Sequence, residues 1–242
     1  SQQEPRLVAH YALRYGLPSV NTIADSYDTD SSTDFHKIVA EMAEIPRDQA
    51  KVINLGLFYG MGKAKLQAEL GVTKYKAEEL FDKYHSRVPF VKQLMNEVMK
   101  AGAKKGQIKT LLGRRCRFPK YEPILRGSDW GKYIPPEDEE RMQDLQKMGP
   151  YLKNDEDEIL KDKDGNPKKN YWHNNPTRRA FTYKALNKLI QGSAADMTKK
   201  AMLELYKEGI TPHIQVHDEL DISVVNDLEA AKIKDVMENA VD

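Results

Sequence analysis

The feature that most restricts the fold is a long amphipathic segment, residues 178–208, followed by strand-like alternation. Its apolar residues recur at helical spacing, and Gly209 comes just after the last of them, a common signal for the end of a helix. The apolar stripe consists of Leu186, Leu189, Ile190, Met197, Ala201 and Leu205. Beyond it, PHIQV and LDISVV alternate like strands on either side of His217-Asp218-Glu219. The sequence therefore predicts a long helix and then an antiparallel hairpin with a carboxylate at its tip.

The segments before residue 178 are mainly helical in pattern. Helices are expected at residues 33–45, at 46–59 and at 74–101, the last as one helix or as two joined near Pro89. Residues 107–119 instead indicate two short strands around a turn at Gly113. The predicted fold class is therefore α+β and predominantly helical.

A polar excursion interrupts these patterns at residues 127–176. It contains 12 acidic and 8 basic residues and is rich in Asn, Pro and Gly. The stretch KNDEDEILKDKDGNPKKN keeps neither a helical nor a strand period, which is typical of a solvated surface insertion. The rest of the chain has 30 basic and 25 acidic residues, so the insertion conceals a modest positive balance elsewhere.

Bulk composition excludes several classes of protein. The net charge of +1 over 242 residues gives no global field that would attract nucleic acid or a membrane surface. Cys116 is the single cysteine, so an intramolecular disulfide framework and a cysteine-rich zinc site are both excluded. The start of the chain lacks the pattern of a signal peptide, and no apolar run approaches the ~20 residues of a spanning helix. These properties predict a soluble intracellular protein with no membrane partner.

One helical face in residues 46–59 has the side chains that a nucleoside triphosphate requires. Arg47, Lys51, Leu55 and Tyr59 recur every four residues, so they share a slowly drifting face that extends roughly 18 Å. Cations suit the phosphates, an apolar side chain suits the sugar, and an aromatic ring suits the base. Arg47 also lies in the first turn, where the helix dipole favours anions. The same pattern equally fits an ordinary surface helix with two exposed cations and a buried tyrosine.

Two further groups of polar residues indicate metal or DNA binding only weakly when taken alone. Asp218, at a strand turn, offers the hard oxygen ligand that Mg²⁺ prefers, but an isolated Asp-Glu pair is more often a solvated hairpin tip. Asn187 and Gln191 lie one helical turn apart, and their amides match the polar edges of a duplex minor groove. Exposed polar residues on a helix are also commonly just hydrated.

The order of the motifs is more specific than any one of them. The chain contains SQQEPRLVAHYA, R-x3-K-x7-YG, T-L-L-G-R-R, N-x3-QG-x-A-A-D and Q-V-H-D-E-L, in that sequence. This series resembles the family A DNA polymerases, the group of bacterial DNA polymerase I and phage replicative enzymes. The resemblance spans nearly the whole chain except residues 127–176. It implies a right-hand polymerase fold, with palm segments at residues 1–16 and 178–242 and the fingers at residues 17–177.

The resemblance also implies a role for each matching residue. The incoming nucleotide would be bound by Arg47, Lys51, Leu55, Tyr59, Glu4 and Gln2. DNA would be contacted by Asn187, Gln191, Gln215, Arg114, Arg115 and Arg179. Catalytic roles would fall to Asp218, Lys51, Arg47, Tyr59, His217 and Glu219, with Asp218 as a metal ligand.

The implied activity is DNA-directed DNA synthesis. The primer 3′-oxygen attacks the α-phosphate of a dNTP with two Mg²⁺ ions in place, and pyrophosphate leaves. The implied partners are primer–template DNA, dNTPs and the missing N- and C-terminal parts of the same polymerase. The implied location is the cytoplasm of a bacterium or of a phage-infected host.

Three positions depart from the family pattern. Leu55 stands where many relatives have an aromatic residue. Tyr183 stands where an arginine is common, so one duplex contact is either lost or taken over by Arg179. The family's first metal-binding aspartate would lie before Ser1, and the final palm strand would lie beyond the last residue. We therefore expect the chain to be an excerpt of a longer polymerase and to be inactive alone. A less favoured alternative is that Ser1 follows an intein that has been removed or split.

Two other classes of function stay open at this point. A catalytically dead nucleic-acid-binding module would keep the basic helix face, although retention of Asp218 argues against it. A metal-dependent phosphohydrolase would need several clustered Asp and His ligands, and one hairpin carboxylate is too few.

Overall fold

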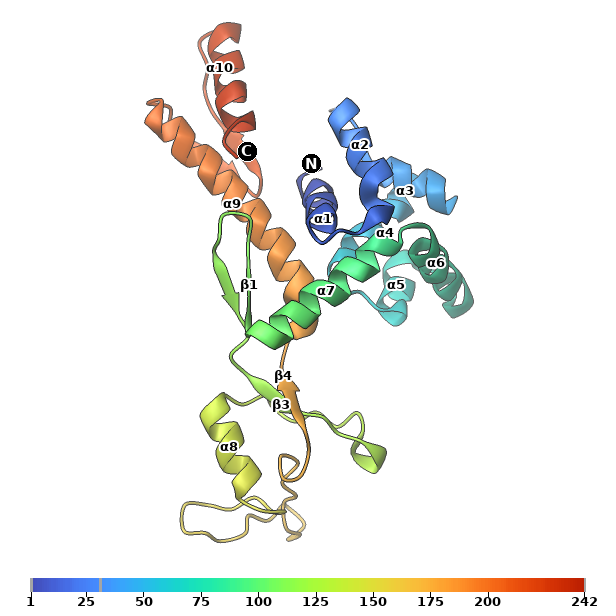
Figure 1. The fold of residues 1–242 in the computed structure, drawn as a ribbon, viewed down its shortest axis with the longest axis vertical. Coiled ribbons are helices and arrows are strands. Elements are labelled where there is room, and N and C mark those ends of the chain that lie inside the picture. The colour runs from blue at the N-terminus through green and yellow to red at the C-terminus, as the bar shows by residue number, and fades with distance from the viewer. Residues whose placement is uncertain (1, 31, 242) are drawn as a thin grey trace. The chain divides into compact units, whose positions relative to one another are not determined.

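The computed structural model describes residues 2–30 and 32–241 (Figure 1). Ser1, on which the expectation about the first metal-binding aspartate depends, lies outside these residues. The chain divides into two compact units. The first comprises residues 1–99, 108–116 and 183–242, and the second comprises residues 100–107 and 117–182. The predicted palm and fingers boundaries are functional divisions, and they remain predictions.

The first unit is a helical assembly followed by a small hairpin. Its N-terminal helices are α1 (Gln3–Arg14), η1 (Pro18–Val20), α2 (Asn21–Thr29), α3 (Phe35–Ala43), α4 (Arg47–Phe58), α5 (Lys63–Leu70) and α6 (Lys74–Arg87). Helix α7 (Pro89–Lys105) leads from this unit into the second. The later elements of this unit are α9 (Ala185–Lys207), β5 (Ile214–Val216), β6 (Glu219–Asp221) and α10 (Asp227–Glu238). Three short elements have residues in both units: β1 (Gln107–Lys109), β2 (Arg115–Arg117) and η3 (Thr182–Lys184).

Aromatic side chains fill the core beneath α3 and α4. Phe35, Phe58 and Phe90 are almost completely buried, and the Phe35 ring lies 5.8 Å from that of Phe58 and 6.4 Å from that of Phe90. Such tilted and edge-on pairs add to the stabilisation that burial provides. Helix α1 packs against α9 and α2, so it joins the first helices of the chain to the long late helix.

Most of the predicted elements are present, and the α+β, predominantly helical fold class is confirmed. Residues 74–101 form two helices, because Val88, before Pro89, has ψ 58°, outside the helical range. The long late helix begins at Ala185, so the predicted start at residue 178 is wrong. Residues 177–179 instead form β4, and Phe181 has a left-handed φ of 62°, which a continuous helix cannot contain.

The hairpin also differs in one detail from its prediction. In the β5–β6 pair, Val216 is opposite Glu219, so the turn consists of His217 and Asp218 alone. Glu219 is therefore the first residue of β6, and the predicted placement of Glu219 at the tip is wrong. Asp218 is at the tip, as expected.

The second unit gives the predicted insertion more structure than its sequence pattern indicated. It contains β3 (Tyr121–Pro123), η2 (Gly127–Asp129), α8 (Glu139–Lys147) and β4 (Thr177–Arg179), with β3 antiparallel to β4. Met142, Leu145 and Trp172 form a small buried cluster. The Asn170 amide donates to the carbonyls of Leu145 and Gly149 at 2.6 and 2.8 Å, which fixes the end of α8. The prediction of a solvated segment therefore holds for residues 153–169, which are exposed apart from the half-buried Lys153 and Asn154. It does not hold for the whole insertion.

A buried polar network holds the β1–β2 turn against α9. The Thr110 hydroxyl and the Arg114 guanidinium, whose Nε is 2.8 Å from Oδ1, both donate to the buried Asp196 carboxylate. Ser193 accepts from the Leu111 N–H at 3.0 Å and shares a 2.8 Å hydrogen bond with Tyr11 of α1. These bonds join α1, α9 and the turn into one arrangement.

The close approach of the turn to α9 requires a glycine. A Cβ at position 192 would lie 2.8 Å from Thr110 Cγ2 and 3.2 Å from an Arg114 guanidinium nitrogen. Thr110 cannot rotate its methyl away without losing its bond to Asp196. We predict that Gly192→Ala lowers the free energy of unfolding by about 1–2 kcal/mol, because the overpacking exceeds the gain of up to about 1 kcal/mol in helix propensity.

Urea denaturation of Gly192→Ala and of Gly192→Ala/Thr110→Ser measures this effect. Serine keeps the hydroxyl but removes Cγ2, so the double variant should recover part of the lost stability. If Gly192→Ala is as stable as the parent, the close contact does not exist in solution.

Candidate functional site

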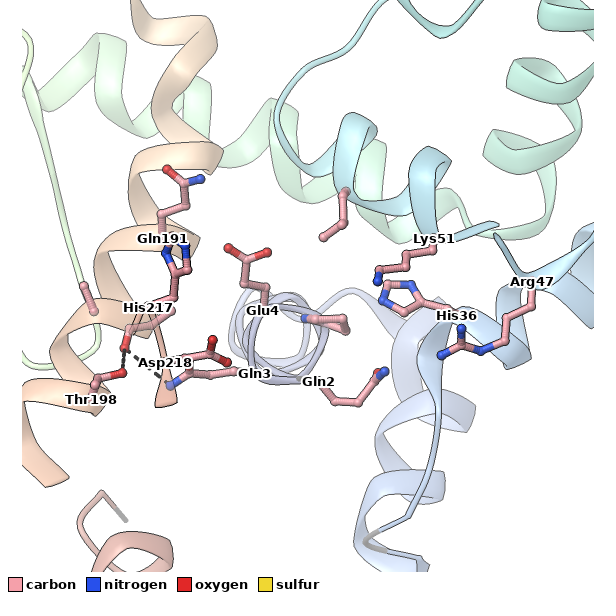
Figure 2. A pocket seen from close by; sticks show the side chains of 14 residues that line it. Gln2, Gln3, Glu4, His36, Arg47, Lys51, Gln191, Thr198, His217 and Asp218 are labelled. Carbon is pink, nitrogen blue, oxygen red and sulfur yellow. Dashed lines mark hydrogen bonds between the residues drawn. The ribbon is translucent and has the colours of Figure 1, made fainter. Parts of the chain in front are cut away.

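A pocket of about 520 Å³ lies in the first unit, where α1, α3, α4, α9 and the β5–β6 turn meet. In Figure 2, Arg47, Lys51 and His36 lie on one side, Gln191, His217 and Asp218 lie on the other, and Glu4 and Gln3 lie between them. Eight of the residues predicted from the sequence line this pocket: Gln2, Glu4, Arg47, Lys51, Leu55, Gln191, His217 and Asp218.

The two cations of the pocket come from the first turns of α4. Arg47 is the first residue of the helix after Pro46, and Lys51 follows one turn later, so both lie near the end where free N–H groups and the dipole favour anions. Both side chains are exposed to solvent. This part of the pocket therefore suits a multiply charged anion.

Asp34 holds Arg47 in place and links three elements. Its carboxylate accepts from Arg47 Nε at 2.8 Å and from the N–H groups of His36 and Lys37, so it also caps the N-terminus of α3. Gln2 donates to the same carboxylate at 3.3 Å and accepts from the N–H of Phe35 at 3.1 Å. Burial would raise the pKa of the Asp34 carboxyl, but the Arg47 hydrogen bond and the backbone donors outweigh it, so the pKa lies below its ordinary value.

His36 is a buried histidine that lines the pocket beside the cations. Burial, together with the charges of Arg47 and Lys51, lowers the pKa of its ring and so favours the neutral form. The Asn54 amide nitrogen lies 3.0 Å from His36 Nδ1. The ring therefore keeps one nitrogen bonded to Asn54, and its neutral form retains one N–H donor.

Tyr59, Glu4 and Gln191 meet through hydrogen bonds between their side chains. Burial and the Glu4 carboxylate raise the pKa of the Tyr59 hydroxyl well above its ordinary value, whereas the Gln191 amide opposes this rise. The hydroxyl therefore donates to Glu4 and accepts from Gln191. Three residues that the sequence assigned to different motifs thus form one contact between α1, α4 and α9.

Asp218 and His217 face the pocket from the hairpin turn. His217 has a left-handed φ of 53°, and its carbonyl accepts from the Gln215 amide at 3.1 Å. This bond orients Gln215 toward the turn of its own hairpin. The Asp218 side chain is exposed and lines the pocket. Among the residues that the structure describes, no group of three or more His, Cys, Asp or Glu is arranged to hold a metal ion.

The other predicted residues lie outside this lining. Tyr59 borders a neighbouring pocket of about 440 Å³ that shares Leu55. Asn187 is half-buried on α9, Glu219 and Gln215 are exposed on the hairpin, and Arg115 is exposed on β2.

Two arginines among the predicted DNA contacts, Arg114 and Arg179, are bonded within the protein. Arg114 donates to Asp196 and to the Gly192 carbonyl, although it remains half-exposed. Arg179 belongs to the second unit, where its guanidinium lies 4.8 Å from the centre of the Tyr121 ring and donates to the Phe118 carbonyl.

Sequence reasoning missed Asp34, His36, Asn54 and Asp196. An N-cap signal identifies Asp34, because an aspartate directly before an apolar periodic segment is a typical helix start. Asp196 ends the motif N-x3-QG-x-A-A-D but was given no role, because its partners Thr110 and Arg114 come from a distant segment. Nothing local identifies Asn54.

Comparison with known proteins agrees with this geometry. The sequence model described as DNA polymerase family A matches residues 1–242. The chain therefore belongs to the family A DNA polymerases, as its series of motifs predicted.

Its relatives come from phages and bacteria. The DNA-directed DNA polymerase of Pseudomonas phage M6 is 32% identical over 98% of this chain, and DNA polymerase I of Pseudomonas aeruginosa is 27% identical over 94%. The chain spans only 34% and 20% of the lengths of these two relatives. The POL domain of Pol1 from M. smegmatis, solved in complex with DNA primer-template and dNTP, matches all of this chain with a TM-score of 0.63 and 25% identity, and the chain covers 36% of it.

No helix within the described residues has both the length and the apolar character to cross a membrane.

Asp34 allows a test of how the cationic side of the pocket is held. We predict that Asp34→Ala lowers the free energy of unfolding by about 1–2 kcal/mol, because it removes the cap of α3 and the partner of Arg47. Asp34→Asn keeps an N-cap acceptor, so it should cost less than about 1 kcal/mol. Asp82→Asn, which breaks an exposed pair with Lys63, is the control and should change the free energy by less than about 0.5 kcal/mol.

The pH dependence separates the charge of Asp34 from its capping role. Because the folded-state pKa is lowered, the stabilisation is fully present above the ordinary value of 3.8 and is lost as pH falls through the lower folded value. The difference between the parent and Asp34→Asn, measured by urea denaturation, should therefore be constant from pH 7 to pH 5 and should shrink below pH 4. A difference that grows on acidification would contradict this assignment.

Proposed function

We propose that this chain forms the fingers and part of the palm of a template-directed DNA polymerase, and that the pocket binds the incoming dNTP. The observation that carries this proposal is the arrangement of one pocket: two cations on α4 face a carboxylate on the hairpin, and Glu4 lies between them. Family membership supports the same function, because the relatives are DNA polymerases.

The triphosphate is proposed to lie along the start of α4. Lys51 and Arg47 meet the phosphate charge, and the N–H of neutral His36 adds a donor that needs no proton exchange at pH 7. Arg47 is partly committed to Asp34 through Nε and Nη2, but its guanidinium has further donors for a phosphate oxygen. Asp34 therefore acts as a positioning residue for Arg47.

Asp218 fits the role of a magnesium ligand. It is an exposed carboxylate at a turn on the side of the pocket opposite the cations, and Mg²⁺ is commonly held by one or two carboxylates together with substrate phosphates. When bound, the ions would stabilise the charge on the attacking and leaving oxygens. Glu4 is less suited to this role, because its carboxylate already accepts from Tyr59.

The number of carboxylates available for metal ions determines whether residues 1–242 can be active by themselves. The described residues place Asp218 and Glu4 as the carboxylates that line the pocket, and only Asp218 is uncommitted to Tyr59. Two-ion chemistry needs a second carboxylate from another part of the polymerase. We therefore expect residues 1–242 alone to extend a primer at no measurable rate.

The rest of the pocket is proposed to bind the sugar and the base pair. Leu55, between Lys51 and Tyr59 on α4, faces the sugar. Tyr59 lies at the base, held by Glu4 and Gln191, so its ring position depends on α1 and α9 as well as on its own helix. Gln191 and Asn187, one turn apart on α9, would contact the primer–template minor groove.

Lys51 provides the experiment that tests the proposed function. In the polymerase that carries this segment, Lys51→Ala should lower kcat about a hundredfold, with a smaller rise in KM, because charge on the α-phosphate grows during transfer. Lys74→Ala, an exposed lysine at the start of α6, is the matched control and should leave kcat unchanged.

Steady-state primer extension with Mg²⁺ measures both variants. Near-normal kcat for Lys51→Ala would remove this lysine from the chemistry. Tight primer–template binding by the parent polymerase with no extension would indicate a catalytically dead binding module instead.

Leu55 predicts a specific substrate preference. A tyrosine there could offer its hydroxyl near the sugar 3′ position and replace the hydrogen bond that a dideoxynucleotide lacks, whereas leucine has no polar atom. The parent polymerase should therefore discriminate strongly against dideoxynucleotides. Leu55→Tyr should reduce this discrimination by roughly tenfold to a hundredfold, because such a bond contributes about 1–3 kcal/mol.

Paired chain-termination assays with natural and dideoxy substrates measure the ratio of kcat/KM values. Leu55→Met is the control, since it changes shape without adding a hydroxyl and should keep the discrimination. Equal discrimination by the parent and Leu55→Tyr would show that position 55 does not face the sugar.

A further inference from the structure

The second unit contains a pocket that the proposed polymerase site does not use. Its volume is about 390 Å³, which is within the usual range of ligand sites. Its lining includes Trp130, Lys132, Tyr133, Arg178 and Ile134. Trp130 and Tyr133 are each 80% exposed, which is unusual for large aromatic side chains at neighbouring positions of one turn.

The turn that presents these two aromatic residues is held firmly. Asp129 forms an ion pair with Lys132 at 2.8 Å and a second one with Lys169, and both lysines also lie over the Tyr171 ring. Lys132 Nζ donates to the Tyr171 hydroxyl at 3.2 Å. These contacts tie the turn to residues about 40 positions away in the sequence. The turn therefore holds Trp130 and Tyr133 at the surface, so a ligand would not have to order them on binding.

Charge is segregated within this unit. Residues 117–134 and 177–182, which we call the basic ribbon, contain six basic and two acidic residues, whereas residues 135–176 contain seven basic and eleven acidic ones. The pairing of β3 with β4 brings the two parts of the basic ribbon together. The pocket belongs entirely to this ribbon, and its lining includes two cations, Lys132 and Arg178, and one carboxylate, Glu122.

We propose that this pocket is a single-stranded DNA site in which unpaired bases stack on Trp130 and Tyr133 while cations of the basic ribbon contact the phosphates. Exposed aromatic faces next to cations are the usual means of binding unpaired strands without sequence preference. Arg178 suits a phosphate contact, because it is 65% exposed and its bond to Glu122 uses Nε. The site goes beyond the proposed polymerase function, because it needs neither a nucleotide nor a metal ion.

The two tryptophans of the chain make the site directly observable. Trp130 is exposed, whereas Trp172 is 3% exposed in the small core, so a base that stacks in the pocket should quench the emission of Trp130 alone. The 242-residue chain is titrated with a 12-nucleotide oligo(dT) without Mg²⁺ or dNTP. We expect saturable quenching whose midpoint shifts to higher oligonucleotide concentration as salt rises. Trp130→Phe should abolish the quenching.

Variants and a matched oligonucleotide make the test specific. Tyr133→Ala should raise the midpoint about tenfold through the loss of one stacking surface. Tyr75→Ala, which removes a tyrosine that is 78% exposed on α6, should leave the midpoint unchanged, as should Lys51→Ala in the proposed dNTP site. An abasic 12-mer keeps the phosphates but lacks bases, so it should not quench.

The absence of quenching by oligo(dT) at low salt would overturn the proposal, and so would equal quenching by the abasic strand. A midpoint that responds to Lys51→Ala but not to Tyr133→Ala would place the bound strand at the dNTP pocket and would also overturn it. Because primer extension does not enter this experiment, its outcome is independent of whether the chain acts in DNA synthesis.

Discussion

Helix α1 is the element on which the geometry of the candidate polymerase site depends, because it bonds to both sides of the pocket. On one side, Gln2 exchanges hydrogen bonds with Asp34 and Phe35 at the start of α3. On the other, Tyr11 meets Ser193 of α9. Glu4 lies between them and accepts from Tyr59. A shift of α1 would therefore move the cations, the tyrosine and α9 together.

Two aspartates fix the arginines that the sequence assigned to nucleotide or DNA binding. Asp34 and Asp196 each neutralise a predicted DNA- or nucleotide-binding arginine, Arg47 and Arg114 respectively, and both also accept from other donors. A carboxylate that fixes one donor of a guanidinium orients the group while the remaining donors stay available to a phosphate. Lys51 carries its charge on a flexible stem, whereas Asp34 fixes the guanidinium of Arg47.

Periodicity was sufficient to predict which residues share one helix face. Arg47, Lys51 and Leu55 recur at a four-residue spacing, and the structure places all three in one pocket. The α+β class and the hairpin tip at Asp218 followed from patterns of the same local kind. Their common property is that every relevant partner lies within a few residues in the sequence.

Features that depend on distant partners could not be predicted in this way. Helix α9 begins at Ala185 because residues 177–179 pair with residues 121–123 across the insertion, which no local period records. The core of the insertion likewise joins Trp172 to α8 over about 25 residues of polar chain. From the sequence alone, Gly192 is a residue that weakens a helix. The reason for a glycine there is the Thr110 methyl, which comes from a distant segment and leaves no room for a Cβ.

The two sides of the candidate polymerase site differ in how firmly they are anchored. The cations extend from α4, whose Ile53, Leu57 and Phe58 are buried in the core. Asp218 extends from a hairpin whose strands are largely exposed, including Ile214 and Val216, and a two-stranded hairpin is only marginally stable by itself. The cationic side of the pocket is thus preorganised by packing, whereas the carboxylate side relies on the turn bond of Gln215. The position of Asp218 is therefore less firmly fixed by packing than the positions of the two cations.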